Sequence, residues 1–216
     1  MKSLKLIIIL ASILGLTGCH ISYNGSAPNT ATVGKPVSKI YDEKKFTRLN
    51  VNSINNDITF KEGKSYRVIY KGYKKLMPTV KQDKNTLTIK TKNTVKFSHK
   101  NPVLIIEMPK TYLQSVKIYT ANGDINGSTL MIHSGNLKTD NGDISLDNLY
   151  LKKKLSVNTG DGDVNINNSN ATGYKLTADN GNVTFNGNDY DDSFKKNVSS
   201  KSILHVYSDN GDISVN

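Results

Sequence analysis

The chain of 216 residues has no tryptophan and one cysteine, Cys19. A single cysteine cannot form a disulfide within the chain, and it cannot supply a metal site built from several thiolates. After Pro109 the sequence contains no proline, no glutamate and no arginine. A stretch without proline can form central β-strands, because every residue can donate to a ladder. An acid–base enzyme in this half would have only Asp, Lys, Tyr and two His side chains to use.

A repeat fills this proline-free half. An alternating apolar run, an Asn-Gly-Asp turn and a second alternating run recur at steps of 19, 20, 19 and 30 residues. Asn-Gly favours a tight turn, since glycine tolerates positive φ and asparagine bonds to its own backbone. The turn residues are Asn122, Gly123, Asp124, Asn141, Gly142, Asp143, Gly160, Asp161, Gly162, Asp163, Asn180, Gly181, Asn182, Asn210, Gly211 and Asp212.

The pattern predicts an all-β fold of stacked repeats. Alternation places one side of each strand inside and the other in water. Two short strands and a turn cannot bury a face alone, but stacked copies can. We therefore expect a solenoid-like, β-helix-like stack with Asn-Gly turns along one edge, with an open β-sandwich as the alternative. The step of 30 needs extra residues, and the polar segment 189–200 is expected to be a surface loop.

The preceding part of the chain carries the pattern less regularly. We expect strands over 46–51 and 66–70, and a hairpin whose strands are 79–81 and 86–90. Asn55-Asn56-Asp57-Ile58 reads as a degenerate copy of the turn and second strand. The run 103–109 is the most apolar after the leader, and it predicts a fully buried strand that Pro109 closes.

Residues 1–18 have the features of an export signal. Lys2 and Lys5 precede an apolar core that is too short to span a bilayer. Leu16-Thr17-Gly18-Cys19 resembles the bacterial lipoprotein signal, which implies cleavage between Gly18 and Cys19 and acylation, for example with palmitate, of the new amino-terminal cysteine. An ordinary secretory peptide or an uncleaved anchor is the alternative.

The predicted lipoprotein signal leaves a chain that consists of a tether and a domain. Residues 19–36 are polar and predict a flexible tether that holds the domain off the outer face of the cytoplasmic membrane. Residues 37–216 are expected to form one β-strand-repeat domain, with a basic half at 37–109 and the repeat half at 110–216.

Positive charge is concentrated in the basic half. The formal net charge of the chain is +11, and segment 61–100 alone has 12 basic and 2 acidic residues. Such a surface attracts an anionic wall polymer, lipid headgroups or an acidic glycan; a solvated face is the alternative. The export signal argues against nucleic acid. The predicted patch comprises Lys64, Arg67, Lys71, Lys74, Lys75, Lys81, Lys84 and Lys90.

We expect no metal, cofactor or catalytic site. Each turn offers one or two carboxylates to Ca²⁺, and ordinary turn chemistry accounts for them. None of the four histidines (His20, His99, His133, His205) has a metal-ligand spacing. A polysaccharide-active enzyme could use Asp191 and Asp192, but these have no Glu, His or Arg nearby in the sequence.

The apolar strand ending at Pro109, followed by Asn-Gly-Asp-Ile units, resembles a bacterial β-strand-repeat family. Its members are called "putative adhesins", and the resemblance covers about 46–216. It implies a non-catalytic, lipid-anchored cell-surface binding protein. The alternative is an envelope-stress or cell-wall-integrity component that acts through an envelope protein; a polysaccharide-active enzyme comes third. The family has no agreed catalytic residues, so the resemblance assigns none.

Overall fold

The computed structural model describes residues 33–91 and 101–216. The predictions for the export signal, for Cys19 and for most of the tether fall outside these residues, as does His99. Within the two described ranges, no helix is long and apolar enough to cross a membrane.

Nineteen strands and one short 3-10 helix make up the described ranges. In chain order they are β1 (Pro36–Glu43), β2 (Arg48–Asn52), β3 (Asp57–Glu62), β4 (Tyr66–Tyr73), η1 (Lys74–Leu76), β5 (Thr79–Asp83), β6 (Thr86–Lys90), β7 (Val103–Met108), β8 (Leu113–Asn122), β9 (Ile125–Gly127), β10 (Leu130–Asn141), β11 (Ile144–Leu151), β12 (Lys154–Asp161), β13 (Val164–Ser169), β14 (Gly173–Asn180), β15 (Val183–Phe185), β16 (Asn188–Tyr190), β17 (Ser193–Lys196), β18 (Ile203–Asn210) and β19 (Ile213–Val215).

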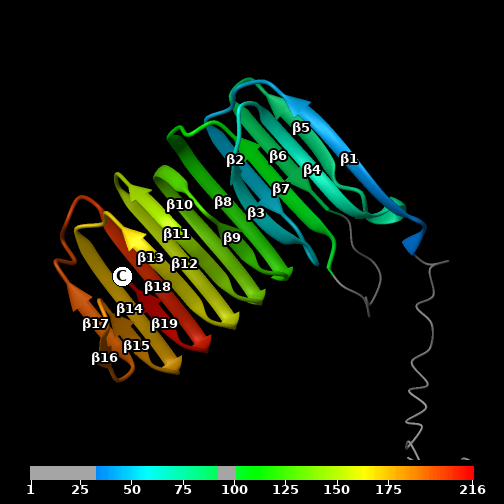
Figure 1. The fold of residues 1–216 in the computed structure, drawn as a ribbon. Helices are drawn as coiled ribbons and strands as arrows, with labels where there is room; N and C mark the ends of the chain where they lie inside the picture. The colour runs from blue at the N-terminus through cyan, green and yellow to red at the C-terminus, as the bar shows by residue number, and fades with distance from the viewer. Residues whose placement is uncertain (1–32, 92–100) are drawn as a thin grey trace, which may run out of the picture.

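The strands form two long ladders around a shared core (Figure 1). Sheet 1 has the order β17-β14-β18-β12-β10-β8-β2-β6-β5, and sheet 2 has the order β16-β15-β19-β13-β11-β9-β3-β7-β4-β1. A repeat gives one strand to sheet 1, turns, and gives the next strand to sheet 2. Equivalent strands of neighbouring coils therefore pair in parallel. The prediction of an all-β, solenoid-like repeat stack is confirmed.

Rows of aligned apolar side chains hold the coils together. In sheet 1, Leu137 is in register with Ile118 on one side and Val157 on the other. All three are at most 2% exposed. In sheet 2, Ile144 lies between Ile125 and Val164 in the same way. Burial of one such side chain contributes about 1.5–3 kcal/mol, so each coil is stabilised mainly by its neighbours.

The coils are not stacked in chain order. The last coil, β18–β19, lies between β12–β13 and β14–β15. At the other end, β2–β3 lies between β6–β7 and β8–β9. The chain thus leaves one position open near each end and fills it with a coil from elsewhere in the sequence (Figure 1).

Antiparallel strands close both ends of the stack. At the carboxyl-terminal end, β16 pairs with β15 and β17 pairs with β14. At the other end, β5 pairs with β6, while β4 and β1 extend sheet 2 beyond β7. The prediction of a surface loop over 189–200 is therefore wrong for half of that segment, which forms the end of β16 and all of β17 but stays at the surface. The residues of β16 and β17 pair with the last parallel strands, because an open parallel edge would otherwise expose a row of unpaired backbone groups.

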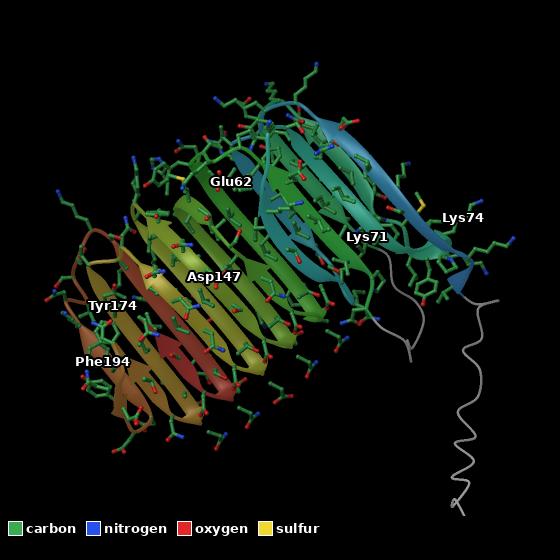
Figure 2. The ribbon with its side chains drawn as sticks, viewed as in Figure 1. Glu62, Lys71, Lys74, Asp147, Tyr174 and Phe194 are labelled. Atoms are coloured by element: carbon green, nitrogen blue, oxygen red, sulfur yellow. The ribbon has the colours of Figure 1, made fainter. Side chains whose placement is uncertain are left out.

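Aromatic side chains seal the carboxyl-terminal end. The rings of Phe185 and Phe194 stack with centroids 4.3 Å apart, and Tyr174 meets Phe185 edge-on at 4.8 Å. Tyr174 and Phe194 are labelled in Figure 2, at the end of the stack that β17 covers. Such pairs add about 0.5–1.5 kcal/mol beyond area burial.

The strand β7 corrects a second expectation. It was expected to be fully buried, but Val103 and Ile105 are only partly buried, whereas Leu104 and Ile106 are fully buried. Ile105 lies on the outer face of sheet 2, beside Ile69 of β4. The reason is that no further layer from residues 33–91 or 101–216 covers this face, so even an apolar run alternates between core and solvent.

Candidate functional site

The predicted turn residues lie in one row, along the edge where strands of sheet 1 end and strands of sheet 2 begin. The Oδ1 atom of each turn aspartate accepts the backbone N–H of the equivalent residue in the adjacent turn. These N–H···O distances are 2.8 Å for Asn182 to Asp212, 2.8 Å for Asp212 to Asp163, 2.8 Å for Asp163 to Asp143, 3.0 Å for Asp143 to Asp124 and 3.3 Å for Asp124 to Asp57. Asp57 ends the row, so the degenerate turn takes a full place in the stack.

Two further ladders run beside the carboxylates. Asn and Asp side chains of neighbouring turns are joined by amide hydrogen bonds, for example from Asn141 Nδ2 to Asn122 Oδ1 at 2.9 Å. Buried hydroxyls on the core side donate to backbone carbonyls of the adjacent turn at 2.9–3.2 Å; they belong to Thr120, Thr139, Thr159 and Ser208. Neighbouring turns are therefore linked through backbone and side chains at once.

Close approach explains the turn glycines. A Cβ atom on Gly142 would lie 2.4 Å from the carbonyl oxygen of Gly123, and one on Gly162 would lie 2.2 Å from that of Gly142. Any side chain at these positions would push the coils apart. Within the described ranges, no three His, Cys, Asp or Glu side chains are grouped so that they could hold a metal ion. The turn edge is thus a structural element of the stack.

The structure divides the predicted basic patch among several surfaces. Lys81 and Lys90 lie on β5 and β6 in sheet 1, whereas Arg67 and Lys71 lie on β4 in sheet 2. Arg67 is engaged by Glu107, with Nε 3.1 Å from Oε1. Lys74 and Lys75 belong to η1, while Lys64 and Lys84 lie in the β3–β4 and β5–β6 connections. Of the predicted patch, Lys81 and Lys90 line a groove.

That groove crosses the outer face of sheet 1. A hollow of about 690 Å³ extends over β6, β2, β8 and β10, and a second of about 490 Å³ extends over β5 and β6. The two hollows share Asn52, Thr88 and Lys90, so they form one surface, called here the basic groove. The lysines that line it are Lys81, Lys90, Lys117 and Lys138.

Strand register orders the groove side chains in straight rows. One row runs Lys90, Asn52, Tyr119, Lys138 across β6, β2, β8 and β10. The parallel row beside it includes Asn50 and Lys117. Neighbouring strands are about 4.8 Å apart, so the two lysines of the first row are separated by about 14 Å along the sheet. Amide and phenol groups occupy the positions between them.

Asp140 orients two members of this row. The hydroxyl of Tyr119 donates to Asp140 Oδ2 at 2.5 Å, and Lys138 Nζ lies 3.1 Å from Oδ1. The hydrogen bond from Tyr119, with help from Lys138, lowers the pKa of Asp140, and the same bond raises the pKa of Tyr119. Asp140 therefore stays ionised and Tyr119 stays protonated at neutral pH, which fixes the ring on the groove floor.

Sequence reasoning missed Lys117, Tyr119 and Lys138 because they lie in the nearly neutral repeat half. An alignment of the repeats could have identified two of these residues. When the repeats are aligned on their turns, Tyr119 and Lys138 fall at the same outward position of consecutive copies. Outward positions that break the small-polar pattern of a repeat are the ones to inspect.

A second groove, of about 630 Å³, lies at the other end of the molecule and is acidic. Its carboxylates come from Asp163, Asp189, Asp191 and Asp212. The side chains that line it are otherwise Asn, Thr, Tyr, Ile and Ser, without His, Glu, Arg or Lys. Asp192 contributes a backbone carbonyl to the N–H of Ala178 at 2.8 Å. Among the described residues that line this groove, these aspartates thus have no basic partner.

The two described histidines lie apart from both grooves. His133 on β10 meets the ring of Tyr112 edge-on, with centroids 5.8 Å apart. His205 lies on β18, where burial, Lys154 and Lys175 lower its pKa. Each histidine is accounted for by its neighbours.

Residues 46–216 match the family described as Toastrack DUF4097. The chain belongs to this family. Its β-strand repeat is the one that the sequence resemblance indicated, and the Toastrack match begins just before β2 and ends at the last residue.

A solved structure shares the fold of this chain, and two others align with it at lower TM-scores. A Clostridium sporogenes protein named a "putative cell adhesion protein" superposes with a TM-score of 0.65 at 18% identity, over 84% of this chain and 99% of that one. A Bacteroides fragilis "putative adhesin" has a TM-score of 0.41 at 14% identity, over 85% and 98%. A Parabacteroides distasonis "putative lipid binding protein" has a TM-score of 0.33 at 10% identity, over 88% and 98%. The first comparison supports the fold. No curated protein matches the chain.

Proposed function

We propose that this Toastrack protein is an exported, lipid-anchored binding protein that holds an extended anionic polymer of the cell envelope in the basic groove. The observation that carries the proposal is the row of Lys90, Asn52, Tyr119 and Lys138 on an exposed sheet face. The lipoprotein-like signal ending at Cys19, and the cell-adhesion name of the Clostridium sporogenes protein that shares this fold, support the location. The proposal includes no catalytic step.

The groove chemistry suits a polymer with repeated negative groups on a hydroxyl-rich backbone. Lysine provides a mobile point charge with three donors, and amide side chains offer both a donor and an acceptor. The ring of Tyr119 adds an apolar surface for a sugar or polyol. Five strands span about 19 Å, which favours several linked units over one small molecule.

The test is binding of the lipid-free mature chain, residues 20–216, to defined polymers. The probes are polygalacturonate as an acidic glycan, poly(glycerol phosphate) as a phosphate polymer, and uncharged dextran as the neutral control. Calorimetry at about 50 mM and about 500 mM salt separates screened electrostatics from other contacts. We expect saturable, salt-sensitive binding to at least one anionic polymer and none to dextran. Binding to dextran alone, or to no polymer, contradicts the proposal.

Two variants with equal charge change locate the site. The groove variant replaces Lys81, Lys90, Lys117 and Lys138 by Gln; the control variant replaces Lys64, Lys71, Lys74 and Lys84 by Gln. Each lysine near an anionic surface contributes about 1 kcal/mol, so the groove variant should lose at least about tenfold in affinity. Equal losses in both variants would show attraction by overall charge and not by the groove.

Anchoring is tested separately in cells. The variant Cys19→Ala should move the protein from the membrane fraction to the soluble fraction, because acyl chains supply the attachment. Retention in the membrane fraction would contradict the proposed lipid anchor, but it would not affect the test of the basic groove. The alternative role in envelope stress has no residue set assigned to it and stays an expectation of the resemblance.

A further inference from the structure

The Asn-Gly pairs of this chain are held very differently by the fold. The sequence contains seven such pairs, and Asn24-Gly25 lies outside the described residues. An asparagine followed by glycine can react with the backbone nitrogen of that glycine, because no side chain obstructs the attack. Whether it does so depends on how firmly the amide and the side chain are held, since the reactive geometry requires both to move.

Inside the stack, the fold restrains the glycine amide, the asparagine side chain or both. The glycine N–H of three turn pairs donates to a carbonyl of the adjacent coil, at 3.1 Å from Gly123 to Asn141, 2.9 Å from Gly142 to Asp161 and 3.1 Å from Gly211 to Asn180. Asn180 is held through its side chain, whose Nδ2 lies 3.1 Å from Asn210 Oδ1. Asn126-Gly127 lies in β9, paired with β3 on one side and β11 on the other.

The pair Asn186-Gly187 lies in a hairpin turn outside the stacked turns. These residues form the two-residue turn between β15 and β16, with φ of 49° and 72°. Two positive φ values mark the hairpin type that Asn-Gly favours. A Cβ on Gly187 would meet nothing within 4 Å. Within the described part of the chain, neither the Asn186 side chain nor the Gly187 N–H has a hydrogen-bond partner, and each flanking strand is only three residues long.

We propose that Asn186 is the site at which the folded domain undergoes spontaneous deamidation, while the stacked Asn-Gly pairs are protected. The Gly187 nitrogen loses its proton to solvent base and attacks Cγ of Asn186. The Cγ–Nδ2 bond breaks, and Nδ2 leaves as ammonia after taking up a proton. Water then opens the cyclic imide at either carbonyl, which gives aspartate or isoaspartate. The reaction needs water alone and no oxidant or reductant.

The modification would act on the cap of the stack. It adds a negative charge beside the acidic groove, which Asp189 and Asp191 already line. Isoaspartate also lengthens the backbone, which disturbs the pairing of Phe185 with Asn188 across the hairpin. Because Phe185 stacks on Phe194, a disturbed hairpin loosens the aromatic seal of the carboxyl-terminal end.

The test compares all pairs within one molecule. The lipid-free chain, residues 20–216, is aged at mildly alkaline pH, and peptide mapping by mass spectrometry follows amide-to-acid conversion at each asparagine. A parallel sample is aged unfolded in denaturant. In the folded sample, Asn186 should convert at least about tenfold faster than Asn122, Asn141 and Asn210, since those must first open the stack. In the unfolded sample, the four rates should converge.

Two results would overturn the proposal. Conversion of Asn186 at or below the rate of Asn141 in the folded protein would show that the hairpin is not a special site. Persistence of the rate difference in denaturant would show that local sequence, not the fold, sets it. The soluble chain needs neither the lipid anchor nor a polymer, so the result is independent of the proposed function.

Discussion

The turn edge and the basic groove are both rows of polar side chains repeated at the strand spacing, but their hydrogen-bonding groups are used differently. At the turn edge, these groups form hydrogen bonds with the next coil, since each turn aspartate accepts a backbone N–H of its neighbour. In the groove, Lys90 and Lys117 are exposed on the outer face of sheet 1. The motif that dominates the sequence thus serves the fold, and less regular outward residues form the proposed binding surface.

The difference follows from geometry. Glycine in each turn lets successive turns approach until carboxylate and N–H meet at about hydrogen-bond distance. On the outer face of a sheet, side chains stand away from the backbone and long ones reach past their neighbours. Polar residues of the same chain therefore become structural or available according to their place in the coil.

The largest effect should come from separating two coils. The variant Gly142→Val places a side chain against the carbonyl oxygen of Gly123, and we expect it to lower the free energy of unfolding by about 2–4 kcal/mol. The control is Gly187→Ala, which meets open space and should cost only about 1 kcal/mol for its positive φ. Urea unfolding measures both. Equal losses would argue against close stacking as the reason for the turn glycine.

A smaller loss should follow from removing one buried hydroxyl. In Thr139→Val the carbonyl oxygen of Gly123 loses its 3.0 Å donor, so unfolding should become easier by about 1–2 kcal/mol. The outward Thr177→Val is the matched control and should change stability by less than about 0.5 kcal/mol. Both proteins should bind polymer like the wild type. A weaker polymer affinity in the Thr139 variant would mean that the edge and the groove are coupled.

Single lysine changes in the groove should show the opposite profile. Lys90→Gln should reduce polymer affinity by about threefold to tenfold, because one charge contact of about 1 kcal/mol is lost. Its unfolding midpoint should stay at the wild-type value, as the side chain is exposed. Lys71→Gln on sheet 2 serves as control. A binding loss that appears equally in the control would remove the distinction between the two faces.

The smallest effect concerns the tyrosine–aspartate pair. In Tyr119→Phe the main hydrogen bond that lowers the pKa of Asp140 is gone, so this pKa should rise toward its usual value. Because the folded-state pKa is lowered, the pair contributes stability above the unfolded-state pKa and loses it as pH falls through the folded-state pKa. NMR titration of the Asp140 carboxyl checks the shift. An unchanged titration would show that Lys138 alone sets it.

Much of the repeat half could be predicted from sequence because its signals are local. Alternation indicated which side of β8, β10 and β12 faces the core, and Asn-Gly or Asp-Gly marked each turn. The coil order could not be predicted. β18 can pair in parallel with β12 or with β14 through the same kind of ladder, so local pattern does not decide between chain order and insertion. The antiparallel caps and the length of the 30-residue step decide it.

For a similar reason, only two of the four groove lysines could be predicted from the sequence. The high density of basic residues in segment 61–100 led to the prediction of Lys81 and Lys90 as part of a patch. The basic residues of β4, which belong to the same segment, lie on the other sheet. Lys117 and Lys138 come from a part of the chain with nearly balanced charge, and strand pairing places β8 beside β2 and β10 beside β8. A charge count along the sequence cannot distinguish the two faces of a stack.

The most direct measurement is lysine footprinting of the protein–polymer complex. Each exposed lysine is acylated with and without bound anionic polymer, and mass spectrometry reads the change residue by residue. We expect protection of the four groove lysines, Lys81, Lys90, Lys117 and Lys138, with unchanged reactivity at Lys64, Lys71, Lys74 and Lys84. Equal protection of both sets, or protection of the second set alone, would contradict the groove as the binding site.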